Sequence, residues 1–266
     1  MIRFAASLPP ILLAATPLWS DPVSDMVSVR ALSGWRMEDG RHMAGLEITL
    51  APGWKTYWRA PGDAGIPPLF DWSGSENIAG VAFHWPVPRV WWSNGMRSIV
   101  YSDRVVIPME FDLAEGTGPA RAVAQVQLGV CEDICVPVQV GFDAVLPEQG
   151  SRNPRIAAAL LDLPRTAAEA GVETVRCGLE PESDGMAVTA RIEMPPIGRQ
   201  ESVVIEAGRP DIWISQPETR RAGDVLIAQA DMVQVEGGAF ALDRSDIRIT
   251  VFGGGTAVDI QGCGAD

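Results

Sequence analysis

The chain has little positive charge, one lysine and two histidines. Its 266 residues carry 21 lysines and arginines against 34 aspartates and glutamates, a formal net charge of −13. Because a nucleic-acid-binding protein needs a basic face to neutralise phosphates, we expect no nucleic-acid partner. The same balance disfavours a polybasic membrane-surface protein. Lys55, His42 and His84 leave little material for Schiff-base chemistry, histidine catalysis or a histidine-rich metal site.

The chain also lacks a long apolar run, but its N-terminus has the pattern of a secretory signal peptide. Residues 1–20 place Arg3 near the start, follow it with an uncharged apolar stretch, and end at the small residue Ser20. This stretch is interrupted by prolines and is too short to span a membrane comfortably. We therefore expect removal of residues 1–20 and a periplasmic location, an oxidising space in which disulfides persist.

Between residues 21 and 150, several segments alternate apolar and polar side chains as β-strands do. Turn-forming residues such as those at 38–40 separate the segments. The pattern is typical of an antiparallel β-sandwich. Pro108 lies inside one expected strand and predicts an edge strand or a bulge there. The expected strands cover 26–32, 46–50, 105–111, 122–130 and 136–145.

The composition changes near residue 150. A polar stretch at 148–153 precedes Pro154, which suits the first turn of a short helix, and Pro164 ends that helix. Strand-type alternation resumes after Gly171. We therefore predict an all-β protein with two tandem β-sandwich domains, at 21–150 and 168–266, joined by a helical linker at 151–167. The second domain's expected strands cover 172–177, 186–192, 203–207, 211–215, 225–230, 247–252 and 257–260.

Four cysteines allow three disulfide connectivities. The domain boundaries favour Cys131 with Cys135, and Cys177 with Cys263. The second pair begins and closes the second domain, and its long loop predicts a structural disulfide worth roughly 4–5 kcal/mol. The first pair closes a loop so short that the same relation gives roughly 2 kcal/mol, so it adds little stability.

The short pair also constrains the local structure. In an extended strand, positions four apart lie about 13 Å from each other, too far for a disulfide. The chain must therefore turn at residues 132–134, and a three-residue hairpin loop would place Cys131 opposite Cys135. A pair at a hairpin tip is accessible to a partner's thiol and can exchange with it.

Other interpretations of the short pair stay open at this point. It could be an inert loop closure, or two thiolates of a metal site completed by His84 or a methionine. Glu132 and Asp133 disfavour the thiolate form electrostatically. The pair should therefore be a weak nucleophile unless Arg59, Arg89 or Arg97 lies close to it.

Aromatic residues crowd the first half of the chain. Seven of the nine tryptophans lie between Trp35 and Trp92. Core packing is the ordinary explanation for most of them. Trp91 and Trp92 differ, because the Asn94-Gly95 turn signal beside them suggests an aromatic loop near the surface.

Four segments in order resemble a known family: GWKTYWRAPGDAG at 53–65, WPVPRV at 85–90, IVYSDRVVIP at 99–108 and GVCEDICVP at 129–137. Together they look like the periplasmic N-terminal domain of the DsbD / ScsB thiol:disulfide interchange family, over about residues 45–147. The ending GGGTAVDIQGC looks like the companion β domain of ScsB-like members.

The resemblance implies an immunoglobulin-like fold with an exchangeable pair at Cys131 and Cys135, and Cys135 is the weakly favoured site of the mixed disulfide. It implies a cap loop at about Trp91 to Met96, which includes Trp92 and Asn94, and aromatic surroundings at Tyr57 and Tyr101. We expect no cofactor and no metal at this site. The cysteine spacing is shorter than in the best-known enterobacterial members.

The family passes electrons from a membrane-embedded domain to periplasmic thioredoxin-fold proteins. Since this sequence shows neither the membrane domain nor the thioredoxin domain, the resemblance implies a separate membrane electron donor of the DsbD/CcdA type. The expected function is therefore a thiol–disulfide exchange relay, acting as a monomer. The alternative is a copper-handling or protein-binding module that uses the cysteine pair, Met96 and His84 near one end of the sandwich.

Overall fold

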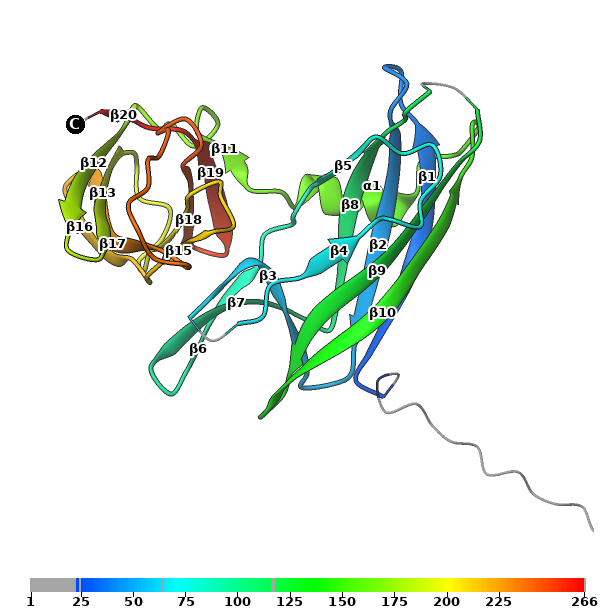
Figure 1. The fold of residues 1–266 in the computed structure, drawn as a ribbon, viewed down its shortest axis with the longest axis horizontal. Helices are drawn as coiled ribbons and strands as arrows, with labels where there is room; N and C mark the ends of the chain where they lie inside the picture. The colour runs from blue at the N-terminus through cyan, green and yellow to red at the C-terminus, as the bar shows by residue number, and fades with distance from the viewer. Residues whose placement is uncertain (1–22, 24, 64, 116–117, 266) are drawn as a thin grey trace, which may run out of the picture.

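A computed structural model of the chain describes residues 23, 25–63, 65–115 and 118–265, so the expected signal peptide lies outside the described residues. These residues form two β-rich halves that meet near one short helix, α1 (Pro154–Leu161) (Figure 1). The prediction of two tandem sandwiches joined by a short helix is thus confirmed. Among the described residues, no helix is long and apolar enough to cross a membrane.

The first half pairs a four-stranded sheet with a larger sheet that carries the cysteine hairpin. The four-stranded sheet has the order β1 (Val27–Arg36), β2 (His42–Leu50), β8 (Arg104–Asp112), β5 (Gly80–Phe83). The larger sheet has the order β10 (Cys135–Leu146), β9 (Ala120–Cys131), β3 (Lys55–Gly62), β7 (Met96–Ser102), β6 (Arg89–Ser93), and β4 (Leu69–Asp71) also pairs with β9.

Strand β2 is buried on both faces, although a sandwich strand usually has one face in water. One face, with Leu46 and Ile48, lies in the core between the sheets. Helix α1 covers the other face with Ile156, which packs against Met43 in a separate apolar cluster. Asn153 caps the start of the helix, and its side chain accepts a hydrogen bond from the backbone N–H of Arg155 in the first turn. The linker helix therefore belongs to the packing of the first half.

The sequence predicted an edge strand or a bulge at Pro108, and the edge-strand alternative is wrong. Strand β8 runs between β2 and β5, and Pro108 pairs with Gly45 of β2. The Pro108 carbonyl accepts from the His84 backbone N–H, just beyond the last β5 pair at Phe83. In an extended residue the N–H and C=O point to the same side, so an N–H at position 108 would also face the β5 side. Because the β5 ladder ends at Phe83, the proline removes no hydrogen bond of that ladder.

The second half has the same plan. One sheet has the order β11 (Arg165–Thr166), β19 (Thr256–Gln261), β18 (Arg248–Gly253), β14 (Ser202–Glu206). The other has the order β15 (Ile212–Ile214), β17 (Val225–Gln234), β13 (Gly185–Glu193), β12 (Thr174–Glu182), β20 (Gly264–Ala265), with β16 (Glu218–Ala222) also on β17. Since β11 already pairs with β19, we propose that the second domain begins a few residues before the expected 168.

Candidate functional site

The candidate site is the tip of the β9–β10 hairpin. Cys131 ends β9, Cys135 begins β10, and the two residues are direct partners in the antiparallel register. They form a disulfide with a Cα–Cα distance of 4.2 Å. The predicted three-residue loop at 132–134 and the predicted pairing are both present.

The two cysteines differ in their access to solvent. Cys131 is 4% exposed and belongs to a small apolar cluster, whereas Cys135 is an exposed residue. Ile134 beside it is 76% exposed, an unusual position for a large apolar side chain. Cys135 and Ile134 are therefore accessible to a molecule that approaches the hairpin tip, whereas Cys131 is shielded.

Tyr57 on β3 places a hydroxyl group against both sulfur atoms. Its Oη lies 2.7 Å from Cys131 Sγ and 3.0 Å from Cys135 Sγ. Burial raises the pKa of Tyr57 above its ordinary value, so the hydroxyl keeps its proton at neutral pH. Two glycines leave room for the ring: a Cβ at Gly65 would lie 2.7 Å from Tyr57 Cδ1, and one at Gly129 2.9 Å from Cδ2. A protonated hydroxyl is thus held where a leaving thiolate would form.

The chain's single lysine lies beside the same pair. Lys55 is the direct ladder partner of Cys131, so the two side chains share one face of the sheet. Its Nζ lies 4.5 Å from the centre of the Trp91 ring and donates to the Gly53 carbonyl at 3.0 Å. Trp91 packs against the cluster that contains Cys131 and Tyr57. A cation and an indole ring therefore lie on the same face of the sheet as Cys131.

The segment expected as a cap loop is a β-hairpin. Strands β6 and β7 are joined by Asn94 and Gly95, both with positive φ (50° and 79°), as a two-residue hairpin turn requires. Trp91 lies within β6, on the face toward Cys131. Trp92 is 55% exposed and Met96, at the start of β7, is 47% exposed. Of the apolar residues expected in the cap, Trp91 packs against the cysteine cluster, and Trp92 and Met96 are not among its apolar neighbours.

Several expected neighbours of the disulfide lie elsewhere. Tyr101 points into the core of the first half, and its hydroxyl donates to the Pro86 carbonyl at 2.7 Å. Arg59 and Arg97 bond to the second half instead of approaching the sulfur atoms. Neighbouring β-strand residues face opposite ways, which is why Val100 joins the cysteine cluster and Tyr101 does not.

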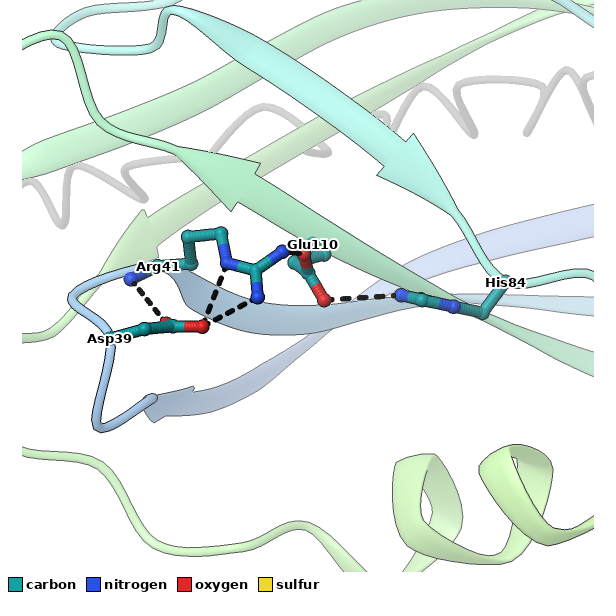
Figure 2. A network of polar contacts seen from close by, with 4 residues as sticks. All are labelled: Asp39, Arg41, His84 and Glu110. Carbon is teal, nitrogen blue, oxygen red and sulfur yellow. Dashed lines mark hydrogen bonds and ion pairs between the residues drawn. The ribbon is translucent and has the colours of Figure 1, made fainter.

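His84 belongs to a polar network on the four-stranded sheet. Figure 2 shows Arg41 between Asp39 and Glu110, with His84 reaching Glu110 from the other side. His84 Nε2 lies 3.3 Å from Glu110 Oε2. Burial, and then the charge of Arg41, lower the pKa of His84 below its ordinary value. Within the described ranges, no group of three or more His, Cys, Asp or Glu side chains is arranged to hold a metal ion.

The second expected disulfide is also present. Cys177 of β12 and Cys263, just before β20, are bonded with a Cα–Cα distance of 5.7 Å. Cys177 is fully buried in the core of the second half, and Cys263 packs against that core.

Sequence reasoning did not place Lys55 or the two glycines at the site. The alternation of the GWKTYW segment was the available signal, since Lys55 and Tyr57 are two apart and share a strand face. Their shared neighbour, Cys131, depends on the β3–β9 pairing. That pairing joins segments more than 70 residues apart, and it could not be read from local pattern.

The sequence was compared with protein families and the fold with solved structures. Residues 25–147 match the family described as thiol:disulfide interchange protein DsbD, N-terminal. No curated protein matches the sequence at a significant level.

Among solved structures, the N-terminal periplasmic domain of ScsB from Proteus mirabilis is similar, with a TM-score of 0.69 and 21% identity over 93% of this chain and 97% of that one. The reduced DsbD N-terminal domain of Neisseria meningitidis gives a TM-score of 0.30 and 16% identity over 50% of this chain and 91% of that chain. Residues 25–147 therefore match the DsbD N-terminal domain family, and the described residues have the fold of the ScsB N-terminal periplasmic domain.

Proposed function

We propose that this protein is a periplasmic thiol–disulfide exchange relay, an oxidoreductase that carries two electrons on Cys131 and Cys135. The donor would be a separate membrane protein of the DsbD/CcdA type, and the clients would be periplasmic thioredoxin-fold proteins. The observation that carries the proposal is the hairpin-tip disulfide, in which one sulfur belongs to an exposed residue and both sulfurs contact the Tyr57 hydroxyl.

The first step is attack of a donor thiolate on Cys135 Sγ. A bond forms between the donor and Cys135, the Cys131–Cys135 bond breaks, and Cys131 leaves as a thiolate. The exposure of Cys135 and the burial of Cys131 favour this choice of sulfur.

The surroundings of Cys131 suit a leaving group. A disulfide breaks faster when the leaving thiol has a low pKa, and a hydroxyl donor and a nearby cation stabilise a thiolate. Tyr57 supplies the donor at 2.7 Å, and Lys55 supplies the cation from the neighbouring strand. The negative charges of Glu132 and Asp133 destabilise a Cys131 thiolate. Tyr57 and Lys55 act against that destabilisation.

The second step releases the donor. Its second thiol loses a proton and attacks the donor sulfur of the mixed disulfide, and Cys135 leaves as a thiolate. The Cys131 and Cys135 thiolates then take up two protons, which match the two that the donor thiols lost before their attacks. The donor dithiol has become a disulfide, and two electrons and two protons have moved to the cysteine pair. The same steps in reverse order reduce a client: Cys135 attacks the client disulfide, and Cys131 then attacks Cys135 Sγ and frees the reduced client.

Trapping of the mixed disulfide tests the proposal. Cys131→Ala leaves Cys135 without its resolving thiol, so incubation with an oxidised, purified thioredoxin-fold protein should accumulate a covalent complex. Non-reducing electrophoresis and mass spectrometry would measure it. Cys135→Ala should trap little, because the remaining Cys131 is buried, and the double variant is the blank. Failure of Cys131→Ala to form the complex, with its Cys135 thiol shown to be free, would contradict the proposal.

A further inference from the structure

The β6–β7 hairpin has different neighbours on its two faces. Trp91 packs against the cluster of Cys131 and Tyr57. Trp92, the next residue, points to the opposite face and lines a cleft shared with the second half. Arg97 is the direct partner of Trp92 in the ladder, so its side chain shares that face. The hairpin therefore lies between the candidate redox site and the second half.

Arg97 bonds the hairpin to the second half. Its Nη1 donates to Ser202 Oγ at 2.6 Å and to the Val203 carbonyl at 2.8 Å. Arg97 is only 3% exposed, and both acceptors lie at the start of β14, the edge strand of its sheet. A buried guanidinium without acceptors would be costly, so this contact strongly favours the observed position of the hairpin.

A second anchor comes from β3, the strand whose tyrosine contacts the sulfur atoms. Arg59 donates through Nε and Nη2 to Glu206 at 3.1 and 2.8 Å, and through Nη2 to Thr250 Oγ1 at 3.2 Å. The guanidinium also lies 3.8 Å from the centre of the Trp58 ring, which meets Phe252 edge to face at 5.4 Å. The second half thus contacts both strands that border the buried side of the disulfide.

The cleft-facing side of the hairpin is only partly packed, since Val90 contacts the core of the first half while the cleft lies beside it. A cleft of about 1140 Å³ separates Val90 and Trp92 from the second half's turn at 253–255. Trp92 remains 55% exposed there. The packing of Val90 and the β3–β7 ladder therefore hold the base of the hairpin, Arg97 holds its tip, and the cleft leaves room for the tip at 91–97 to move away from Cys131.

We propose that the second half is a clamp on the cap: Arg97, supported by Arg59, holds the tip of the β6–β7 hairpin against Cys131, and release of these bonds lets the tip bend toward the cleft. The clamp rests on the proposed exchange function, since access to Cys131 matters only when the disulfide opens. Arg97 is then a positioning residue that acts on the site through Trp91. The second half would set how readily the buried sulfur can be reached.

Chemical access to Cys131 tests the clamp without any redox partner. In the full chain carrying Cys135→Ser, Cys131 is the only free thiol, and its alkylation is measured with a bulky polyethylene-glycol maleimide and with iodoacetamide. Arg97→Met should raise the rate with the bulky reagent roughly fivefold to tenfold, as expected for loss of a charge-assisted hydrogen bond. The rate with iodoacetamide should change less than about twofold, because a small reagent needs less movement of the hairpin than a bulky one.

Arg121→Met is the matched control, because the Arg121–Asp143 ion pair is exposed and does not involve the second half. If Arg97→Met lowers the melting temperature, Glu206→Gln, which weakens the Arg59 anchor, replaces it as the test variant. It should raise the alkylation rate with the bulky reagent by a smaller factor. Unchanged rates in a variant that keeps the parent's melting temperature overturn the clamp. Failure of the exchange function alone is distinguishable, because alkylation would still depend on Arg97 while no thioredoxin-fold dithiol reduced the parent disulfide.

Discussion

The two disulfides of this chain belong to similar sheets but differ in loop length and in exposure to solvent. In the Cys177–Cys263 bond, which joins residues 86 apart, Cys177 is fully buried and Cys263 is partly buried. Cys131–Cys135 joins residues 4 apart at a hairpin tip, with Cys135 exposed. Loop-closure entropy makes the first bond a large contributor to stability and the second a small one.

The comparison separates strength from accessibility. A bond that closes a long loop against a core is costly to remove. A bond at a hairpin tip can open while the two strands stay paired by their own ladder. The hairpin keeps Cys131 and Cys135 together after reduction, so the site can close again without refolding.

Removal of each bond should give the largest contrast. Cys177→Ala with Cys263→Ala should lower the free energy of unfolding of the second half by roughly 4 kcal/mol, and Cys131→Ala with Cys135→Ala that of the first half by roughly 2 kcal/mol or less. Hydrogen exchange in urea, followed peptide by peptide, measures each half. Equal losses would remove the distinction between a structural and an exchangeable bond.

The two halves should also differ in how much folding stability they lose in acid. Burial, and then the charge of Arg36, lower the pKa of His42 to about 4. The folded state thus favours neutral imidazole. This contribution to stability is complete above the unfolded pKa near 6.5 and is lost as the pH falls toward 4, by roughly 3 kcal/mol. The pKa of His84 is lowered too, so it acts in the same direction.

The second half contains no histidine among residues 165–265, so its stability should change much less between pH 6.5 and 4.5. The same exchange measurement at several pH values checks this. His42→Leu should flatten the profile of the first half. An equally steep profile in the second half would argue against His42 as the cause.

The two tyrosines provide a matched pair at the site. Tyr57→Phe removes the hydroxyl from Cys131 and should slow reduction of the Cys131–Cys135 disulfide by a dithiol roughly tenfold, because the leaving thiolate loses a donor. Tyr101→Phe removes a hydroxyl that bonds to Pro86 in the core and should leave this rate unchanged. Stopped-flow measurement of reduction compares them, and equal slowing would point to a general loss of structure.

The adjacent tryptophans give a smaller and sharper contrast. Trp91→Ala uncovers the cysteine cluster and should speed alkylation of the reduced pair by a bulky reagent by roughly threefold to fivefold, which corresponds to less than about 1 kcal/mol of lost shielding. Trp92→Ala acts on the cleft face and should change the rate less. Thiol alkylation in still-folded variants measures both rates. A larger effect of Trp92→Ala would reverse the assignment of the hairpin's faces.

Much of the fold was predictable because it depends on local sequence patterns. Alternation predicted most long strands, Pro154 and Pro164 bracketed the helix, and the spacing of Cys131 and Cys135 required a turn between them. Strands β3, β6 and β7 were not predicted, since the burial of their side chains does not alternate regularly along the strand.

The surroundings of the site depend on long-range contacts that local pattern does not encode. The Asn94-Gly95 turn was recognisable, but only the β6–β7 ladder shows that Trp91 and Trp92 face opposite ways. The bond between Arg97 and Val203 joins residues 106 apart. An isolated arginine in the sequence carries no sign of such a partner.

The most direct measurement is selective reduction of the wild-type chain. A reduced thioredoxin-fold protein is added to the fully oxidised chain, free thiols are labelled, and peptides are mapped by mass spectrometry. The account predicts rapid labelling of Cys131 and Cys135 while Cys177 and Cys263 remain joined. Labelling of all four at the same rate, or of none, would contradict a relay at the hairpin tip.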